Sequence, residues 1–260
     1  MALSNFDRRR VNGPEESFSP IFASEKSDSN QWKIGQPRSK RGPLDIRPTF
    51  LQPGLISQAN GSAYIETEQT KIACAIYGPR QPKNIAYSEN GRLNVEVKFT
   101  PFSCRRRRAP LRDAEDRTIA MAVHQAIVSS VRLELLPKAT IDVFITVIEA
   151  DGIEGVISSA SVAVSAALAD AGIEILGLVV SCSASVMAKE IWLDPTEDEA
   201  TASQGTLILS CIPALGTITS VWQNGQIPPG DALNAMEACQ NRCTDIHGAV
   251  AQALREYSNS

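Results

Sequence analysis

The chain has 260 residues, of which 43% are hydrophobic and 21% charged, and its formal net charge is −4. This length allows one large domain or two small ones, and the composition is typical of a globular protein with a sizeable core. A net acidic surface does not attract nucleic acid as a whole, so any such attraction must be local. No run approaches the ~18 apolar residues of a membrane span, and the N-terminus lacks a signal-type apolar core. We therefore expect an intracellular protein that does not contact membranes.

The cysteines predict buried, reduced thiols and no metal site. They lie apart, mostly in apolar segments, at Cys74, Cys104, Cys182, Cys211, Cys239 and Cys243. Cys239 and Cys243 are four residues apart, but only His247 follows at a similar spacing, so a zinc site there would lack a fourth ligand. Free cysteines in an intracellular protein are most often small buried side chains.

Residues 1–42 form a basic segment that is poor in apolar residues. Its positive charge is concentrated in Arg8–Arg10 and in residues 38–41 (RSKR). The composition predicts a basic, partly flexible N-terminal arm. Phe22 and Trp32 are unusual in a free tail, so two interpretations stay open: a solvated tail, or an arm that orders against a partner.

Short β segments follow the arm. Runs typical of strands cover residues 46–57, 61–66, 71–79 and 93–99. The second and third runs are joined by polar residues 67–70, which predicts a β-hairpin. Alternating apolar residues in the fourth run predict a further strand.

A run of arginines carries the densest positive charge outside the arm. Its members are Arg105, Arg106, Arg107, Arg108 and, slightly apart, Arg112. Adjacent guanidinium groups repel one another, so we expect the run to project from a loop. One interpretation is a solvated loop that helps solubility. The other, which we favour, is RNA contact by these five arginines, because guanidinium groups match phosphate oxygens.

A helix is predicted after the arginine run. Asp113 can cap its first N–H groups, and Glu115 and Asp116 suit the positive end of the helix dipole. Apolar residues recur at helical spacing from Ile119 to Val131, and Pro137 marks the expected end of the helix.

The stretch from residue 141 to residue 172 predicts a strand, a tight turn and a helix of small residues. Residues 141–148 are β-branched and almost continuously apolar, as is typical of a strand covered on both faces. Gly152 permits the positive φ that a turn needs, and Gly172 is placed to end the helix. Alanine and serine dominate this helix, so another backbone can approach it closely, and its first free N–H groups would face a phosphate.

Strands and one long helix are predicted for the remainder of the chain. Four apolar runs predict two pairs of strands, at residues 176–188, 189–196, 206–213 and 217–225. The acidic loop between the two pairs carries Asp194, Glu197, Asp198 and Glu199. A last helix is predicted from about Asp231 to Tyr257. This order of elements indicates an α+β fold with helices packed on mixed sheets.

Six segments in one order resemble the RNase PH family of phosphorolytic exoribonucleases, and within it the eukaryotic exosome ring subunits. They are GPEES, RGPLDIRP, RRRRAP, LADAGIE, LVVSC and WLDPT. The resemblance covers about residues 43–257. It implies an RNase PH-like fold, of the ribosomal protein S5 domain 2 type, for those residues.

The resemblance also indicates where the family's chemistry is missing. Active members hold inorganic phosphate with an arginine in a turn close to ADGGTRTAS, and they use two aspartates six residues apart. The turn here is ADGIEGVIS, which places Gly155 at the arginine position and Glu154, a carboxylate that repels phosphate, beside it. Asp198 matches the first aspartate, but Gln204 stands at the second position. The resemblance therefore implies a chain without catalytic residues, metal or cofactor.

The implied function is that of a structural subunit of the RNA exosome ring, which helps to assemble the ring and to thread RNA through its central channel for 3′–5′ processing and degradation. The implied partners are other RNase PH-like ring subunits, S1/KH cap subunits, RNA and an associated 3′–5′ exoribonuclease, in the nucleus, nucleolus and cytoplasm. In related subunits the loop that corresponds to Arg105–Arg108 faces the channel, so these arginines would grip phosphates without reading sequence. Two alternatives stay open: an active phosphate-dependent 3′–5′ exoribonuclease, and an RNA-binding protein that acts alone.

Overall fold

A computed structural model of the chain describes residue 38 and residues 41–81, 88–105, 107–108, 114–187 and 190–259. Residues 34–260 form one compact unit, to which all the elements below belong. The unit contains two sheets with helices packed against them, which confirms the predicted α+β class. Most of the predicted arm, with Arg8–Arg10, Phe22 and Trp32, lies outside the described residues.

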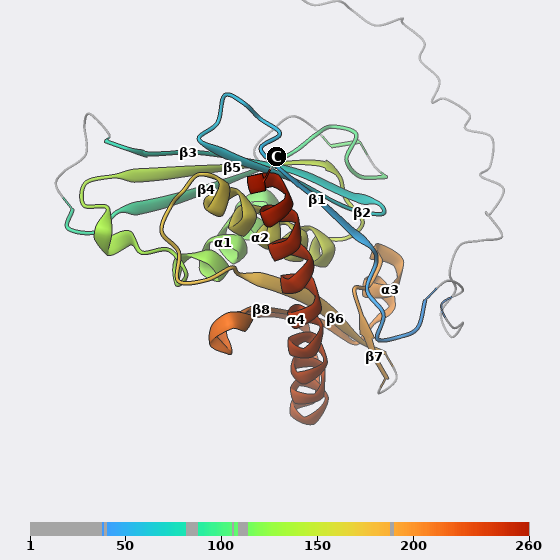
Figure 1. The fold of residues 1–260 in the computed structure, drawn as a ribbon. Helices are drawn as coiled ribbons and strands as arrows, with labels where there is room; N and C mark the ends of the chain where they lie inside the picture. The colour runs from blue at the N-terminus through green and yellow to red at the C-terminus, as the bar shows by residue number, and fades with distance from the viewer. Residues whose placement is uncertain are drawn as a thin grey trace, which may run out of the picture. The chain divides into compact units, whose positions relative to one another are not determined.

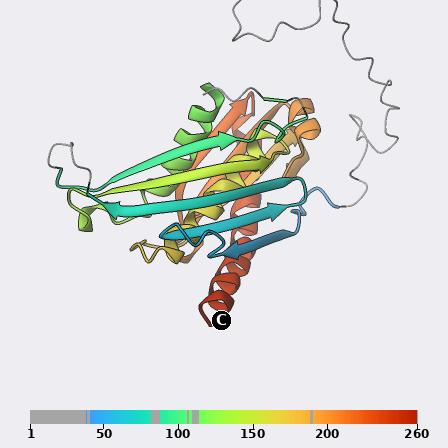
Figure 2. The same cartoon turned by 90° about the horizontal axis from the view of Figure 1, so that it is seen from above.

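The first sheet has five strands in the order β1-β2-β3-β5-β4 (Figure 2). Their bounds are β1 Thr49–Pro53, β2 Gly61–Thr67, β3 Thr70–Arg80, β4 Arg92–Phe99 and β5 Thr140–Glu149. The predicted hairpin is confirmed as β2 and β3, with a shorter turn than expected because Thr67 already pairs with Thr70. Only β4 and β5 run parallel, since a helix connects them.

Strand β5 is covered on one face, contrary to the sequence-based expectation. Ile141, Val143, Ile145 and Val147 are buried, whereas the alternating residues are mostly half-buried. Figure 2 shows no helix over the near face of this sheet within the described part of the chain. The apolar run therefore does not distinguish a strand that is covered on both faces from a strand whose outer face is uncovered but still carries large apolar side chains.

The second sheet has four antiparallel strands in the order β7-β6-β8-β9. Their bounds are β6 Val180–Met187, β7 Glu190–Leu193, β8 Gly205–Ile212 and β9 Thr217–Gly225, with the short 3₁₀ helix η2 Pro213–Leu215 before β9. All of β8 and nearly all of β6 is buried. Thr206 faces helix α2 and Cys182 faces helix α4, so these two strands are the ones covered on both faces.

The predicted first helix is present as α1 Ala114–Val128, but it ends well before Pro137. The chain then forms an isolated β-bridge between Val131 and Ile175 and the 3₁₀ helix η1 Leu133–Leu135. The bridge takes Val131 out of the helical pattern, which is a tertiary effect that the local spacing does not contain. Asp113 lies outside the described residues.

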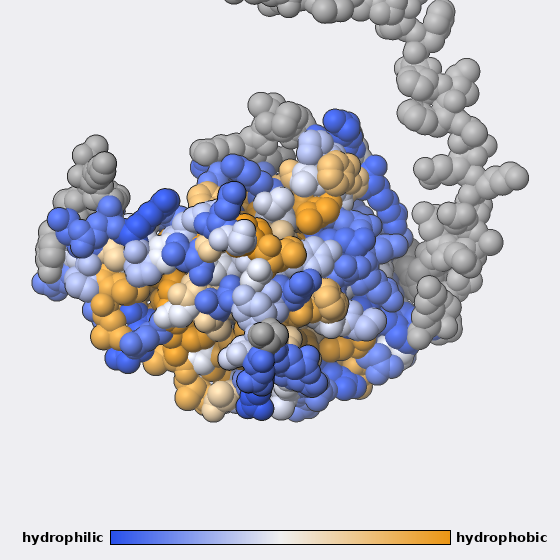
Figure 3. All heavy atoms as spheres, turned by 45° about the horizontal axis from the view of Figure 1, so that its top comes forward, coloured by the Kyte–Doolittle hydropathy of each residue, from blue (hydrophilic) through white to orange (hydrophobic). Residues whose placement is uncertain are grey.

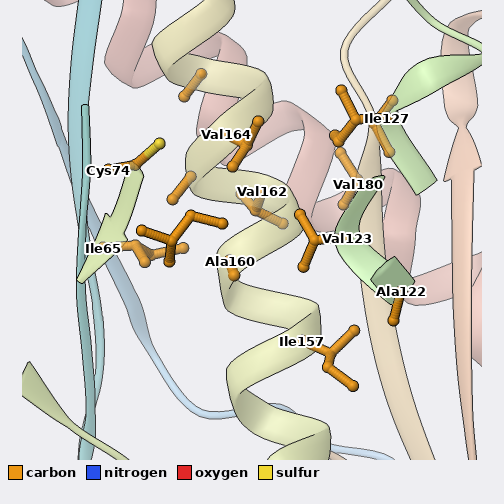
Figure 4. Packing of buried hydrophobic residues seen from close by; sticks show 14 of the residues in the cluster. Ile65, Cys74, Ala122, Val123, Ile127, Ile157, Ala160, Val162, Val164 and Val180 are labelled. Carbon is orange, nitrogen blue, oxygen red and sulfur yellow. The ribbon is translucent and has the colours of Figure 1, made fainter. Parts of the chain in front are cut away.

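Helix α2 (Ile153–Asp170) is the centre of the core. Figure 4 shows it between Ile65 and Cys74 of the first sheet on one side and Val123 and Ile127 of α1 on the other. Gly61 confirms the predicted close approach: a Cβ atom there would lie less than 3.0 Å from backbone atoms of α2 and the residue after it. Small side chains on α2 therefore bring β2 against it.

Helix α2 is also long and apolar enough to cross a membrane by length and composition alone, contrary to the expectation that no run approaches that size. However, 78% of it is buried inside the protein, as is typical of a core helix. Its ends were predicted correctly, since Gly152 before it and Gly172 after it both have positive φ.

The last two helices are α3 Glu197–Ala202 and α4 Pro229–Asn259. Helix α3 replaces most of the predicted acidic loop, because the Thr196 side chain accepts from the Glu199 N–H and Glu199 accepts from the Thr196 N–H. The long α4 confirms the predicted C-terminal helix and crosses the second sheet (Figure 1).

The cysteines are free, and all but Cys104 are buried. The fold brings Cys182 and Cys211 of the second sheet next to Cys239 and Cys243 of α4, where thiol contacts and burial raise the pKa of Cys239 and Cys243. Among the described residues, no three His, Cys, Asp or Glu side chains are placed to hold a metal ion. Figure 3 shows a largely polar face interrupted by separate hydrophobic patches.

Candidate functional site

The turn between β5 and α2 is the position at which the family would hold phosphate. Gly152 caps α2 with φ +85°, and no side chain caps the helix there. Asp151, just before it, is 5% exposed. Gly155 lies in the first turn of α2, and a Cβ atom there would be 3.5 Å from both the Arg47 Nη2 and the Thr70 Oγ1. A guanidinium group therefore does lie beside Gly155, but it comes from a distant part of the chain.

Arg47 is buried and is held by two carboxylates. Its Nη1 donates to Asp151 Oδ2 at 2.6 Å, its Nη2 to Asp194 Oδ1 at 2.6 Å and its Nε to Asp194 Oδ2 at 2.8 Å. Burial alone lowers the pKa of Arg47, but hydrogen bonds and charge from Asp194 and Asp151 outweigh burial and raise it. The guanidinium is thus permanently charged, and two carboxylates already neutralise it and take three of its five N–H groups, which disfavours the binding of an added phosphate.

The N-terminus of α2 carries an internal carboxylate. Glu154 is buried, and its Oε1 accepts a hydrogen bond from Thr206 Oγ1 of β8 at 2.9 Å. A negative charge in the first turn suits the helix dipole. A carboxylate that repels phosphate therefore lies in the first turn of α2, close to the N–H groups that would attract one.

Two arginines of the predicted arm join the same region. Arg38 makes a bidentate pair with Glu199, at 2.9 and 2.7 Å, and lies over the Trp192 ring at 4.9 Å. Arg41 donates to Asp194 Oδ2 at 3.1 Å and to its carbonyl oxygen at 2.7 Å. The segment that leads into β1 consequently runs beside β7 and α3 (Figure 1). Part of the acidic loop is thus used to hold the chain's own basic segment.

Asp198, which the resemblance matches to the family's first aspartate, is paired as well. Its two oxygens accept from Arg105 Nη1 and Nη2, both at 3.0 Å, and Glu197 Oε2 lies 4.0 Å from Arg105 Nε. Gln204, which the resemblance places at the second aspartate position, is exposed and lies just after α3. With one carboxylate occupied and an amide in place of the other, these residues do not fit a divalent cation, which prefers several carboxylate oxygens.

The predicted RNA-binding arginines differ in how they are held. Arg107 is exposed and makes no ion pair within the described part of the chain. Arg108 lies over the Phe99 ring at 4.0 Å and pairs with Glu115 at 2.7 Å and Asp116 at 3.4 Å. Arg106 and Arg112 lie outside the described residues. RNA contact by this run stays a prediction.

A cavity of about 40 Å³ lies beside Arg47 and is lined partly by hydroxyl groups of Thr49, Ser158, Ser181 and Ser183. The Ser183 hydroxyl is buried and has no hydrogen-bond partner in the described part of the chain. Because one buried water needs roughly 10–15 Å³, this space suits a few water molecules and not a nucleotide.

Sequence reasoning missed the arginine cluster of Arg38, Arg41 and Arg47. Arg47 lies 104 residues from Asp151 and 147 residues from Asp194, so no local pattern connects them. Helix α3 was missed despite a usable signal, because Thr196 followed three residues later by Glu199 is the pattern of a capping box.

Three features define the class of protein: the two-sheet fold, the strand–turn–helix at Gly152, and the acidic segment that contacts this turn. Residues 45–174 match the family described as "3' exoribonuclease family, domain 1" (RNase PH), and the chain belongs to this family. This confirms the family that the sequence motifs indicated.

Its similarity to individual relatives extends over most of the chain. It is 33% identical over 255 residues to "Exosome complex component mtr3" of Schizosaccharomyces pombe, covering 95% of each chain. It is 34% identical to "Exosome complex component MTR3" of Homo sapiens, covering 85% of this chain and 84% of the relative.

Solved structures share the fold at lower identity. "Crystal Structure of rice (Oryza sativa) Rrp46" superposes with a TM-score of 0.69 at 22% identity, covering 80% of this chain and 96% of that one. The structure titled "archaeoglobus fulgidus exosome with RNA bound to the active site" gives a TM-score of 0.71 at 18% identity, covering 80% and 90%. The RNase PH-like fold is therefore confirmed.

Proposed function

We propose that this chain is a non-catalytic subunit of the RNA exosome ring, with roles in ring assembly and in guiding RNA through the central channel. The two relatives described above are both named as exosome components, and the similarity covers 95% and 84% of their lengths. The proposed partners are other RNase PH-like ring subunits, S1/KH cap subunits, an associated 3′–5′ exoribonuclease and RNA. The proposed location is the nucleus, nucleolus and cytoplasm.

One observation carries the non-catalytic part of the proposal. The guanidinium nearest to Gly155 belongs to Arg47, and it is held by Asp151 and Asp194 at 2.6 Å each. Phosphorolysis needs a phosphate dianion held and activated at this turn, and an arginine that already has two carboxylate partners does not supply a binding site for it. The neighbouring Glu154 carboxylate repels phosphate, and the Gln204 amide does not replace a second aspartate. Both therefore also disfavour phosphorolysis.

The test is an assay for phosphate-dependent RNA degradation by the purified chain and by the assembled ring. We expect no nucleoside diphosphate from the chain at any phosphate concentration. Release of nucleoside diphosphates that disappears in Asp198→Asn would overturn the proposal and favour an active phosphorylase.

Ring membership and RNA guidance are tested separately. We expect the chain to co-elute with the other ring subunits in size-exclusion chromatography, and a monomer that ignores them would favour an RNA-binding protein that acts alone. In the assembled ring, Arg107→Glu should weaken the protection of RNA from nuclease while assembly survives. Arg255→Glu on α4 is the matched control, since Arg255 is also exposed and makes no ion pair among the described residues but lies outside the loop.

A further inference from the structure

The loop between β4 and α1 presents its arginines to different surroundings. Arg105 and Arg107 are exposed, and Arg108 is partly enclosed by Phe99, Glu115 and Asp116. Arg105 alone of these three faces a carboxylate from another part of the fold, Asp198 of α3. A positively charged loop that is proposed to bind RNA is therefore partly neutralised by the chain itself.

We propose that Asp198, assisted by Glu197, competes with RNA phosphate for Arg105 and so limits the strength of RNA contact by this loop, whereas Arg107, which has no ion-pair partner among the described residues, binds phosphate without this competition. The inference rests on the proposed function, because it requires that the loop contacts RNA.

The geometry of the pair makes the competition direct. Arg105 Nη1 and Nη2 donate to the two oxygens of Asp198 at 3.0 Å each, which is the fork arrangement that arginine also uses for phosphate. The same two donors cannot serve both acceptors, so RNA must break the pair to use Arg105. Glu197 Oε2, 4.0 Å from Arg105 Nε, adds a second negative charge that repels an approaching phosphate.

Both partners of the pair are held in place by the fold. On the α3 side, the Glu197 N–H donates to Asp151, and Glu199 closes the capping box and binds Arg38. On the loop side, the Arg108 N–H donates to the Pro101 carbonyl, and the Ala150 N–H to the Ser103 carbonyl. The contact is thus built into two anchored segments.

The exposure of the pair sets the size of the effect. The Arg105 and Asp198 side chains are 60% and 37% exposed, so solvent and salt screen their attraction. Ion pairs of this kind contribute little, and the expected change in RNA affinity when the pair is removed is an increase of up to about fivefold. RNA can therefore displace Asp198 from Arg105, but breaking this pair costs free energy. Binding of RNA phosphate to Arg107 does not carry that cost.

The experiment measures binding of a fluorescent single-stranded RNA to the assembled ring by anisotropy, at low and at physiological salt. The variants are Asp198→Asn, Arg105→Gln, their combination, and Arg107→Gln. Asp245→Asn is the matched control, because Asp245 is also in an exposed 3.0 Å arginine pair but lies on α4. Size-exclusion chromatography of each ring checks that assembly is unchanged.

We expect Asp198→Asn to tighten RNA binding about two- to fivefold at low salt and less at physiological salt, and Asp245→Asn to leave it unchanged. The tightening should vanish when Arg105→Gln is also present, and Arg107→Gln should weaken binding more than Arg105→Gln does. Tightening that persists without Arg105 would overturn the inference, as would unchanged or weaker binding in Asp198→Asn. If neither Arg105→Gln nor Arg107→Gln affects binding, the proposed RNA contact itself fails and the inference with it.

Discussion

Arg47 holds two carboxylates in the interior of the fold, and its replacement by methionine tests how much these ion pairs matter for stability. The residue is 2% exposed, and its guanidinium makes three hydrogen bonds to the carboxylates of Asp151 and Asp194. Methionine keeps much of the volume but removes the charge and every donor. Two carboxylates would then remain in the interior without their main partner.

The expected loss in the free energy of unfolding is about 3–5 kcal/mol, the usual cost of removing one partner of a buried ion pair. Most of this loss reflects the carboxylates left behind. We therefore expect the combination Arg47→Met, Asp151→Asn and Asp194→Asn to be more stable than Arg47→Met alone. Arg242→Met, which breaks exposed pairs with Asp45 and Asp245, should change the free energy of unfolding by no more than about 1 kcal/mol.

Urea unfolding of the purified chain, followed by circular dichroism, measures these differences at pH 7. A loss below about 1 kcal/mol in Arg47→Met would refute the reasoning, because it would mean that water or side-chain movement compensates the carboxylates. A triple variant less stable than Arg47→Met would refute the claim that unpaired charge causes the loss.

Two further predictions concern stability at acid pH and the packing around Gly61 and Gly155. Burial raises the pKa of Asp194, but hydrogen bonds and charge from Arg47 outweigh it and lower the pKa, so this carboxylate stabilises the fold above its unfolded pKa of about 3.9 and the stabilisation is lost as pH falls through the lower folded pKa. We expect Asp194→Asn to cost stability at pH 7, and the difference from the parent chain to narrow as pH falls below about 4 in urea titrations; a constant difference at all pH values would contradict this. Gly61→Ala should destabilise by more than about 2 kcal/mol, because its Cβ would meet the backbone around Ala167, whereas Gly155→Ala, with 3.5 Å contacts only, should cost less than about 1 kcal/mol. Thermal unfolding compares the two variants, and equal losses would refute the packing argument.

The hairpin, the strand–turn–helix around Gly152, the stop at Gly172 and the C-terminal helix were predictable, because glycine conformation, β-branched runs and helical spacing are local properties. The family resemblance also lay in short local motifs, and the match over residues 45–174 confirmed it. Local signals were less reliable where tertiary pairing intervened, as at Val131, which leaves the predicted helix for a bridge with Ile175. They did not show which face of β5 would remain uncovered.

The sequence by itself determined that residues 151–158 contain no arginine and that residues 198–204 contain a single aspartate, where the resemblance to the family implies an arginine and two aspartates. Only the tertiary structure decided that Arg47 would lie beside Gly155, bound to Asp151 and Asp194, and that Asp198 would hold Arg105. The physical reason is that the charge state of a site depends on all groups within a few ångströms of it. Those groups come from segments about a hundred residues apart, whose proximity is set by the packing of both sheets around α2.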